Sequence, residues 1–188
     1  MRYLYALMGI LLLLAALAAA GSFEADMDVD TYVNANDADQ SHGESDLLWV
    51  TSEKGTHVNE TYLSFVNFFG SQSIFRPEQI KSAKLTLDAA RVEKAGKVKA
   101  YFFEGAIFNN VNWSDKAEYD INVSSAAVEI EEEGSYELNV TAIIQKAVES
   151  CTEGCPYSII LVAEDDASVG FTSSEASDED MPTLEYVT

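Results

Sequence analysis

Residues 83–89 of the chain, AKLTLDA, alternate apolar and polar side chains at every position. Because successive side chains of a β-strand point to opposite faces of the sheet, the alanines and leucines share one face, and Lys84, Thr86 and Asp88 share the other. One apolar and one polar face are typical of an antiparallel sheet that covers a core on one side and meets water on the other. The segment therefore predicts a strand of an antiparallel sheet.

The same two-residue period recurs in residues 97–103, 127–131 and 135–140. Residues 62–68 and 158–163 are apolar on both faces, which predicts two central strands that are covered from both sides. Many short strands separated by turn residues are typical of a two-layered sheet structure. The pattern predicts an all-β, antiparallel β-sandwich.

One segment, near 141–150, breaks the strand pattern. Thr141 is a residue type that caps helices, which favours a helix over residues 142–150. The apolar positions of this helix would form one stripe: Ile143, Ile144, Ala147 and Val148. We therefore expect one short helix that closes an end of the sandwich.

The N-terminus has the features of a secretory signal peptide. A basic start, Arg2, precedes an uncharged apolar run that ends in three small residues at Ala20. We predict a signal peptide over residues 1–20 and a single domain over residues 21–188, with no membrane span after cleavage and no second domain. An uncleaved N-terminal anchor is the alternative. The predicted location is extracellular or at the cell surface.

The chain carries 32 acidic and 11 basic residues, and loss of Arg2 with the signal peptide leaves ten basic ones and a net charge of −22. This charge excludes nucleic acid as a partner, because phosphate binding requires Lys and Arg. Seven of the ten basic residues lie between Arg76 and Lys99. We interpret this basic stretch either as a site for an acidic polymer or an acidic face of another copy, or as chance clustering on exposed strand faces.

Cys151 and Cys155 are the only cysteines of the chain. An isolated pair in an exported protein predicts a disulfide, within the chain or with a neighbouring copy. The chain has two histidines, His42 and His57, and neither lies near the cysteines in the sequence, so no zinc-ligand pattern is present.

Asparagine sequons, N-x-[ST], are more frequent than chance would give. They begin at Asn59, Asn112, Asn122 and Asn139. Their number predicts a glycosylated surface protein. The alternative is that Asn and Thr are simply common near turns and strand edges.

The C-terminal segments 170–175, GFTSSE, and 182–186, PTLEY, enclose an acidic stretch that by itself is typical of a solvated tail. Together with earlier segments in the same order, they resemble the DNRLRE domain, also grouped as carbohydrate-binding module family 96, with related modules in disaggregatase-related proteins of methanogenic archaea. The other matching segments are 30–33 (DTYV), 42–43 (HG) with 47–50 (LLWV), 62–65 (YLSF), 80–87 (IKSAKLTL), 113–115 (WSD) and 138–141 (LNVT).

The resemblance implies a jelly-roll-like sandwich in a secreted or cell-surface protein, with carbohydrate as its ligand. It also implies that residues 174–180 form a loop between two strands, so that Leu184 and Tyr186 point inward. Two positions depart from the family pattern. Glu60 and Thr61 stand where the family frequently has an Arg, and Asn139 stands where it has an aspartate.

Binding of carbohydrate would use exposed aromatic faces, and the candidates are Trp49, Trp113 and Tyr119, each with core packing as its alternative. Lys84 and Arg91, from the basic stretch, are candidates for contacts with an acidic polysaccharide such as a uronate polymer. Ca²⁺ is the one candidate cofactor, since loop acids supply the oxygen ligands that it prefers, and solvated loop acids are the alternative. The candidate ligands form two groups: Asp37, Asp39 and Glu44, and Glu164, Asp165, Asp166 and Glu175.

Catalytic motifs are missing from the sequence: there is no G-x-S-x-G, no H-E-x-x-H and no phosphate loop, which predicts that the protein is not an enzyme. A lone sandwich has edge strands that can pair with other copies. We therefore expect a secreted structural protein that assembles with itself in an archaeal sheath, envelope or matrix. The alternative is a carbohydrate-binding module that recognises an acidic or cell-wall polysaccharide.

Overall fold

The computed structural model describes residues 21–188, and the predicted signal peptide lies outside them. The elements of this part are, in chain order, β1 (Ser22–Glu24), β2 (Met27–Asn34), η1 (Ala35–Asp37), β3 (Leu47–Glu53), β4 (Thr56–Val66), η2 (Phe69–Gln72), η3 (Pro77–Gln79), β5 (Ser82–Lys94), β6 (Gly96–Phe103), η4 (Trp113–Asp115), β7 (Asp120–Ser124), β8 (Val128–Ile130), β9 (Gly134–Asn139), α2 (Thr141–Ser150), β10 (Pro156–Ala163), β11 (Ala167–Thr172) and β12 (Thr183–Val187).

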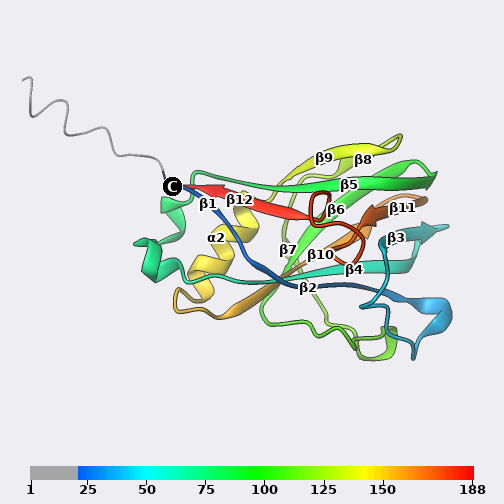
Figure 1. The fold of residues 1–188 in the computed structure, drawn as a ribbon, viewed down its shortest axis with the longest axis horizontal. Coiled ribbons are helices and arrows are strands. Elements are labelled where there is room, and N and C mark those ends of the chain that lie inside the picture. Colours follow the sequence, from blue (N-terminus) through cyan, green and yellow to red (C-terminus); the bar gives the residue numbers. More distant parts are fainter. Residues whose placement is uncertain (1–20) are drawn as a thin grey trace, which may run out of the picture.

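The strands form two antiparallel layers that face each other across one core (Figure 1). Hydrogen-bonded neighbours follow the order β1-β12-β5-β11-β3-β4-β10-β6-β7, with β2 on β4, β8 on β6 and β9 on β5. The core lies between the β12-β5-β11-β3 half and the β4-β10-β6 half of this order, and both halves contribute buried side chains: Leu48, Leu63, Phe65, Leu85, Leu87, Phe171 and Leu184. The predicted all-β antiparallel sandwich with one helix is confirmed.

The two predicted central strands are β4 and β10, which pair with each other. Their inward side chains, Leu63 and Ile159 among them, enter the main core. Their outward side chains enter a second apolar group, which we name the outer cluster: Val33, Tyr62, Ile107, Ile160 and Val162. The connection between β6 and β7, residues 104–119, covers this face. Both faces of β4 and β10 are therefore removed from water, as their sequence predicts.

The C-terminal strand β12 lies between β1 and β5. Leu184 and Tyr186 are fully buried and Glu185 is exposed. The Tyr186 hydroxyl accepts a hydrogen bond from Asn67 at 3.1 Å and donates one to Gln72 at 2.6 Å. The predicted closing strand is therefore confirmed.

The acidic stretch before β12 is a loop that is anchored at its start. The Asp30 side chain, 5% exposed, accepts hydrogen bonds from both the backbone N–H and the hydroxyl of Ser174, each at 2.7 Å. A buried carboxylate requires such donors, because burial without them is costly. The pair joins the start of the domain to the loop that precedes its last strand.

The helix α2 begins one residue earlier than expected and closes one end of the sandwich (Figure 1). Its four predicted apolar residues are all buried. The expectation that Thr141 caps the helix is wrong, because the N-cap is Val140, which has no capping side chain. Instead, Asn139 Oδ1 accepts from the Thr141 backbone N–H at 3.1 Å, and Thr141 Oγ1 accepts from the Ala83 N–H at 2.9 Å.

No helix of residues 21–188 has both the length and the apolar content needed to span a membrane.

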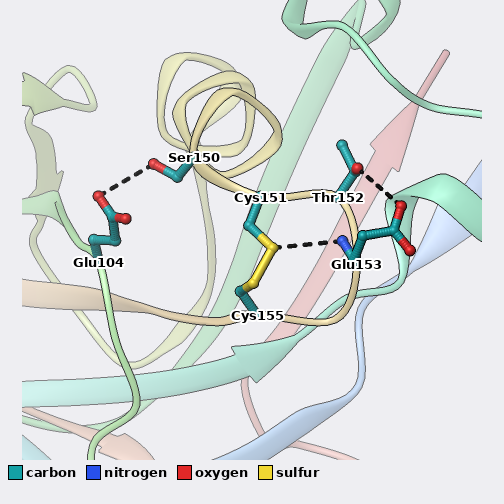
Figure 2. The surroundings of a disulfide bond; sticks show 6 residues. All are labelled: Glu104, Ser150, Cys151, Thr152, Glu153 and Cys155. Carbon is teal, nitrogen blue, oxygen red and sulfur yellow. Dashed lines mark hydrogen bonds between the residues drawn. A yellow bond between two sulfur atoms is a disulfide. The ribbon is translucent and has the colours of Figure 1, made fainter.

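Cys151 and Cys155 form a disulfide within the chain, at the turn between α2 and β10 (Figure 2). Just before this turn, Ser150 donates a hydrogen bond to Glu104 at 3.3 Å. The Thr152 carbonyl accepts from the Gly70 N–H at 2.8 Å, which links the disulfide loop to η2. Gly154 has a φ of +85°, a backbone conformation that favours glycine.

We predict that Leu184→Ala lowers the free energy of unfolding by about 2–5 kcal/mol, because it leaves a cavity in the core beneath β12. Glu185→Ala, on the exposed face of the same strand, is the matched control and should change it by less than about 1 kcal/mol. Urea unfolding followed by tryptophan fluorescence measures both. Equal effects would show that β12 is not packed into the core. Deletion of residues 181–188 should unfold or aggregate the domain.

Replacement of both cysteines, Cys151→Ser with Cys155→Ser, should lower the free energy of unfolding by about 2 kcal/mol, since a loop this short gains a small entropic stabilisation from its crosslink. Reduction of the wild type should reproduce the loss. Thermal unfolding with and without reductant tests this, and the double variant is the control because reductant should not change it. A wild type that is indifferent to reductant would contradict the prediction.

Candidate functional site

The five residues proposed for carbohydrate contact lie in three separate places. Trp49 and Arg91 lie together on the face of β3 and β5 that points away from the core. Trp113 and Tyr119 belong to the β6–β7 connection that covers the outer cluster. Lys84 lies elsewhere on β5, between two carboxylates. The predicted set therefore does not form one site.

Trp49 lines a groove of about 320 Å³ between β2, β3, β4, β5 and β11, which we name the Trp49 groove. Its neighbours along β3, Leu48 and Val50, are buried in the core, so alternation turns the indole outward. The indole lies over Gly170 of β11, where an added Cβ would meet its ring at 3.4 Å. The ring is half-buried and keeps one face toward the groove. Trp49 therefore lies outside the core, and its role as a platform stays a prediction.

The rest of the groove is polar. Asn34, Asn59 and Ser168 line it together with the carboxylates Glu53 and Glu93. Lys and Arg do not occur among the groove's lining residues in the described part of the chain. An apolar ring bordered by hydroxyl, amide and carboxylate groups is the combination that holds a small polar ligand with an apolar face.

The Asn59 amide is the least satisfied polar group in the groove. Its Nδ2 donates to Thr51 Oγ1 at 2.9 Å, but its buried Oδ1 has no hydrogen-bond partner among residues 21–188. If the amide is turned over, Thr51 contacts the oxygen, and the nitrogen is the atom left without a partner. A buried polar atom without a partner costs about 1–3 kcal/mol.

Arg91 extends the aromatic surface. Its guanidinium lies 6.0 Å from the centre of the Trp49 ring, at the outer limit of a cation–π contact, and 3.2 Å from the Glu93 carboxylate. The other Glu93 oxygen accepts from the Ser168 hydroxyl at 3.3 Å. The arginine is therefore neutralised by its neighbour and positioned beside the indole.

Tyr32 also lines the groove, and its ring stacks on His42. Their rings stack at 4.3 Å, with 11° between the ring planes. Burial raises the pKa of Tyr32 and lowers the pKa of His42, so the stack is uncharged at neutral pH. The charge of the groove therefore comes from its carboxylates, Glu53 and Glu93.

Trp113 and Tyr119 pack against the outer cluster rather than forming an open platform. The Lys116 ammonium lies 3.9 Å from the centre of the Trp113 ring, and Tyr119 contacts Tyr101 with ring centres 4.7 Å apart. Burial, with the nearby Glu60 charge, raises the pKa of Tyr119 to about 12. For these two aromatics the packing alternative describes the structure.

Lys116, which lies over the Trp113 ring, also contacts a buried carboxylate of β4, Glu60. Its side chain is 1% exposed and contacts Lys116 at 2.5 Å, the Tyr62 hydroxyl at 3.0 Å and His57 at 3.2 Å. Burial alone would raise the pKa of Glu60, but hydrogen bonds from His57, Lys116 and Tyr62 outweigh burial and hold the pKa below its usual value. The carboxylate therefore joins the connecting loop to β4.

Five of the seven residues of the basic stretch contact a carboxylate, and Arg91 with Glu93 is one of these pairs. Lys84 contacts Glu137 at 2.9 Å and Glu185 at 3.2 Å, which raises its pKa through both hydrogen bonds. The other pairs are Lys94 with Asp166 at 3.0 Å, Lys97 with Asp165 at 3.5 Å and Lys99 with Glu164 at 3.1 Å. Five of the seven basic residues of the stretch are therefore paired, whereas Arg76 and Lys81 are exposed and have no ion pair among residues 21–188.

The candidate calcium ligands do not assemble in the described part of the chain. Three of them, Glu164, Asp165 and Asp166, pair with lysines, and Asp39 accepts a hydrogen bond from Ser114 at 3.0 Å. Residues 21–188 contain no group of three or more His, Cys, Asp or Glu side chains placed to hold a metal ion. The calcium site stays a prediction.

The four sequons differ in their surroundings. Asn122 and Asn139 are exposed. Asn112 is half-buried, and its side chain accepts from the Asp115 N–H at 3.1 Å. Asn59 faces the Trp49 groove with its amide nitrogen bonded to Thr51. Glycosylation therefore stays a prediction for Asn122 and Asn139, and the geometry at Asn59 opposes it.

Sequence reasoning named Trp49 and Arg91 but missed the groove around them. Asn34, Thr51, Ser168 and Glu93 come from four strands, and only the pairing of those strands brings them to one place. One signal in the sequence indicates the outward direction of Trp49, because this residue stands between two core residues of an alternating strand. The pairing partners were not readable from local patterns.

Comparisons with known proteins give one family. The model of the family described as Carbohydrate-binding module family 96 matches residues 22–188. No curated protein matches the chain. Among solved structures, the chain is similar to the enzymatically active domain of tailspike protein 4 of bacteriophage CBA120, at 11% identity and a TM-score of 0.31. The match covers 91% of this chain and 20% of the tailspike chain, and a similarity this low carries no argument.

We predict that Glu60→Gln lowers the free energy of unfolding at pH 7 by about 3 kcal/mol, because the variant leaves the Lys116 charge without its partner. A carboxyl whose pKa is lower in the folded state stabilises the fold above its unfolded pKa, and this contribution is lost as the pH falls through the folded pKa. The difference between wild type and variant should therefore narrow below about pH 4.

Urea unfolding at several pH values measures this difference. Glu118→Gln, in the same connection and exposed, is the matched control and should stay within about 0.5 kcal/mol of wild type. A difference for Glu60→Gln that does not change between pH 7 and pH 3 would refute the charged role of this carboxylate.

Proposed function

The chain belongs to carbohydrate-binding module family 96, and on that premise we propose that it is a non-catalytic module that binds polysaccharide in the Trp49 groove. One observation supports the location: an outward-facing indole lines a groove whose other walls are mostly polar. This puts the alternative of the sequence analysis first. Assembly of copies into a sheath becomes the second candidate.

The groove matches the chemistry of a sugar ring. A pyranose has a face of C–H groups and an edge of hydroxyls, so it needs an apolar platform beside hydrogen-bonding groups. Trp49 supplies the platform, and Asn59 and Ser168 supply groups at its edge. Aromatic rings give large contact areas with few rotatable bonds, which lowers the entropic cost of binding.

A non-catalytic role is supported by the family and by the contacts of one of the groove's two carboxylates, Glu93. Hydrolysis of a glycosidic bond uses two carboxyl groups, one as acid and one as base or nucleophile. Both oxygens of Glu93 are engaged, with Arg91 and with Ser168. A carboxylate held in this way is suited to position neighbouring groups rather than to exchange protons.

We propose an extracellular location on two grounds, the disulfide and the signal peptide that the sequence predicts. Disulfides form and persist in oxidising compartments and are rare in the cytosol. Here the disulfide closes the turn whose Thr152 carbonyl accepts a hydrogen bond from η2. The local packing therefore includes the oxidised form of the two cysteines. We also propose that the protein comes from an archaeal cell surface, and this part rests on the family resemblance alone.

Self-assembly, the second candidate, has one supporting observation. Phe68 and Phe75 are 58% and 61% exposed and lie on either side of the disulfide loop, where Phe68 covers Gly154 and Phe75 approaches Gly70. Exposed apolar patches mark interaction sites. Light scattering and negative-stain microscopy of wild type and of Phe68→Ser with Phe75→Ser test it. Assemblies that the double variant loses would support this role, and a monomeric wild type would exclude it.

We predict that Trp49→Ala weakens polysaccharide binding at least about 30-fold, which corresponds to about 2 kcal/mol, because the platform is lost. Trp113→Ala is the control for the other tryptophan and should leave the affinity within about threefold if it still folds. Affinity electrophoresis in gels that contain single polysaccharides measures both, with circular dichroism to verify folding. A folded Trp49→Ala variant with unchanged retardation would place the binding site elsewhere.

A further inference from the structure

We propose that Asn122 and Asn139 carry N-linked glycans, and that these glycans keep the edge strands β7 and β9 from pairing with strands of other copies. The inference selects the two exposed sequons of the four and gives their glycans a function. It does not depend on the Trp49 groove or on the ligand that the groove binds.

The first argument is where the sheets have open edges. Five strands of the described part pair with a single neighbour: β1, β2, β7, β8 and β9. The free side of such a strand presents backbone N–H and C=O groups with which another chain can pair. β1 and β8 have only three residues each, and β2 contains one exposed and one buried aspartate, Asp28 and Asp30. Short length and charge are two of the usual protections of an edge.

β7 and β9 are longer and have weaker protection. In β7, Ile121 is 73% exposed, the largest exposed fraction among the large apolar side chains of residues 21–188, and the one carboxylate, Asp120, stands at the first residue. In β9, the Glu137 charge is neutralised by Lys84 at 2.9 Å. Each of these two edges contains one exposed sequon asparagine.

At Asn139 the fold determines which amide atom faces water. The Thr141 backbone N–H can only donate, so the atom 3.1 Å from it is the oxygen, Oδ1, which also accepts from the Thr141 hydroxyl at 2.7 Å. Nδ2, the atom to which a glycan is attached, therefore points away from these contacts. Asn139 lines a groove of about 440 Å³ over β1, β5, β9 and β12, which has room for the first sugar residues.

Asn122 lies at a second groove, of about 380 Å³, between β7 and α2. Its Nδ2 donates to the exposed Asp120 at 3.1 Å. An asparagine amide has two N–H bonds, and glycosylation replaces one of them. The contact with Asp120 can therefore persist in the glycosylated protein.

The modification is a group transfer from a lipid-linked oligosaccharide. Nδ2 forms a bond to the anomeric carbon of the first sugar, and the bond from this carbon to the lipid phosphate breaks. The phosphate leaves with the electron pair, and Nδ2 loses one proton. The product is a bulky and solvated group. Since paired strands lie only about 4.7–4.9 Å apart, a glycan on an edge strand overlaps the space that the side chains of an added strand would occupy.

Peptide mapping of protein secreted from yeast tests the modification. Enzymatic release of the glycans in heavy-oxygen water converts each modified asparagine to a labelled aspartate, which mass spectrometry locates. We expect the label at both Asn122 and Asn139. An unlabelled site would overturn the inference for its strand.

Size-exclusion chromatography with light scattering tests the function of the glycans. Asn122→Gln with Asn139→Gln should have at least about twice the weight-average mass of the glycosylated protein at the same concentration, because its edges are open. Addition of Ile121→Lys and Ser135→Lys, one charge in each edge strand, should restore the mass of the monomer. These lysines lower the net negative charge, so general repulsion would not explain the recovery.

Two outcomes would overturn the shielding role: a folded, glycan-free variant that stays monomeric, or association that the lysines do not reverse. Melting curves verify folding, since Asn139 also holds the Thr141 N–H at the start of α2. If Asn139→Gln does not fold, Asn139→Asp with Ser124→Ala removes both sequons, keeps the acceptor oxygen at position 139 and is judged by the same outcomes.

Discussion

The structure depends on the need to cover β4 and β10 on both faces. Their side chains are apolar on either side, so one layer of strands is not enough to remove them from water. The β12-β5-β11-β3 half covers the inner face, and the connection of residues 104–119 covers the outer one. Burial of apolar area at about 25 cal/mol per Å² makes this double cover the main source of the fold's stability.

The outer cover is a loop, and a loop cannot saturate its backbone groups as a strand does. It is therefore attached to polar groups on the sheet it covers. Ser64 Oγ accepts from the Ile107 N–H at 3.4 Å, and Ser158 donates to the Gly105 carbonyl at 2.9 Å. Glu60 with Lys116 adds a charged attachment at the far end. Burial of the Glu60 carboxylate costs free energy, and hydrogen bonds from three donors offset this cost.

The sequence predicts the layers better than it predicts the site, for a physical reason. Period-two alternation fixes which face of a strand is inward, so Leu184, Tyr186 and the outward direction of Trp49 follow from local pattern. The helix was predictable from its stripe, but its cap was not, because Thr141 bonds to Ala83, 58 residues away in sequence. The Trp49 groove lies at a junction of five strands, and local patterns do not specify which strands are neighbours.

The basic stretch shows the same limit for electrostatics. In sequence, Lys84, Lys97 and Lys99 have few acidic neighbours, so they resemble a cationic patch. Cross-strand pairing and the β10–β11 turn bring carboxylates from segments 50–100 residues away onto each of them. A chain with 32 acidic residues almost guarantees such partners once it folds. Charge clusters in an acidic protein therefore indicate where ion pairs will form once the strands are paired.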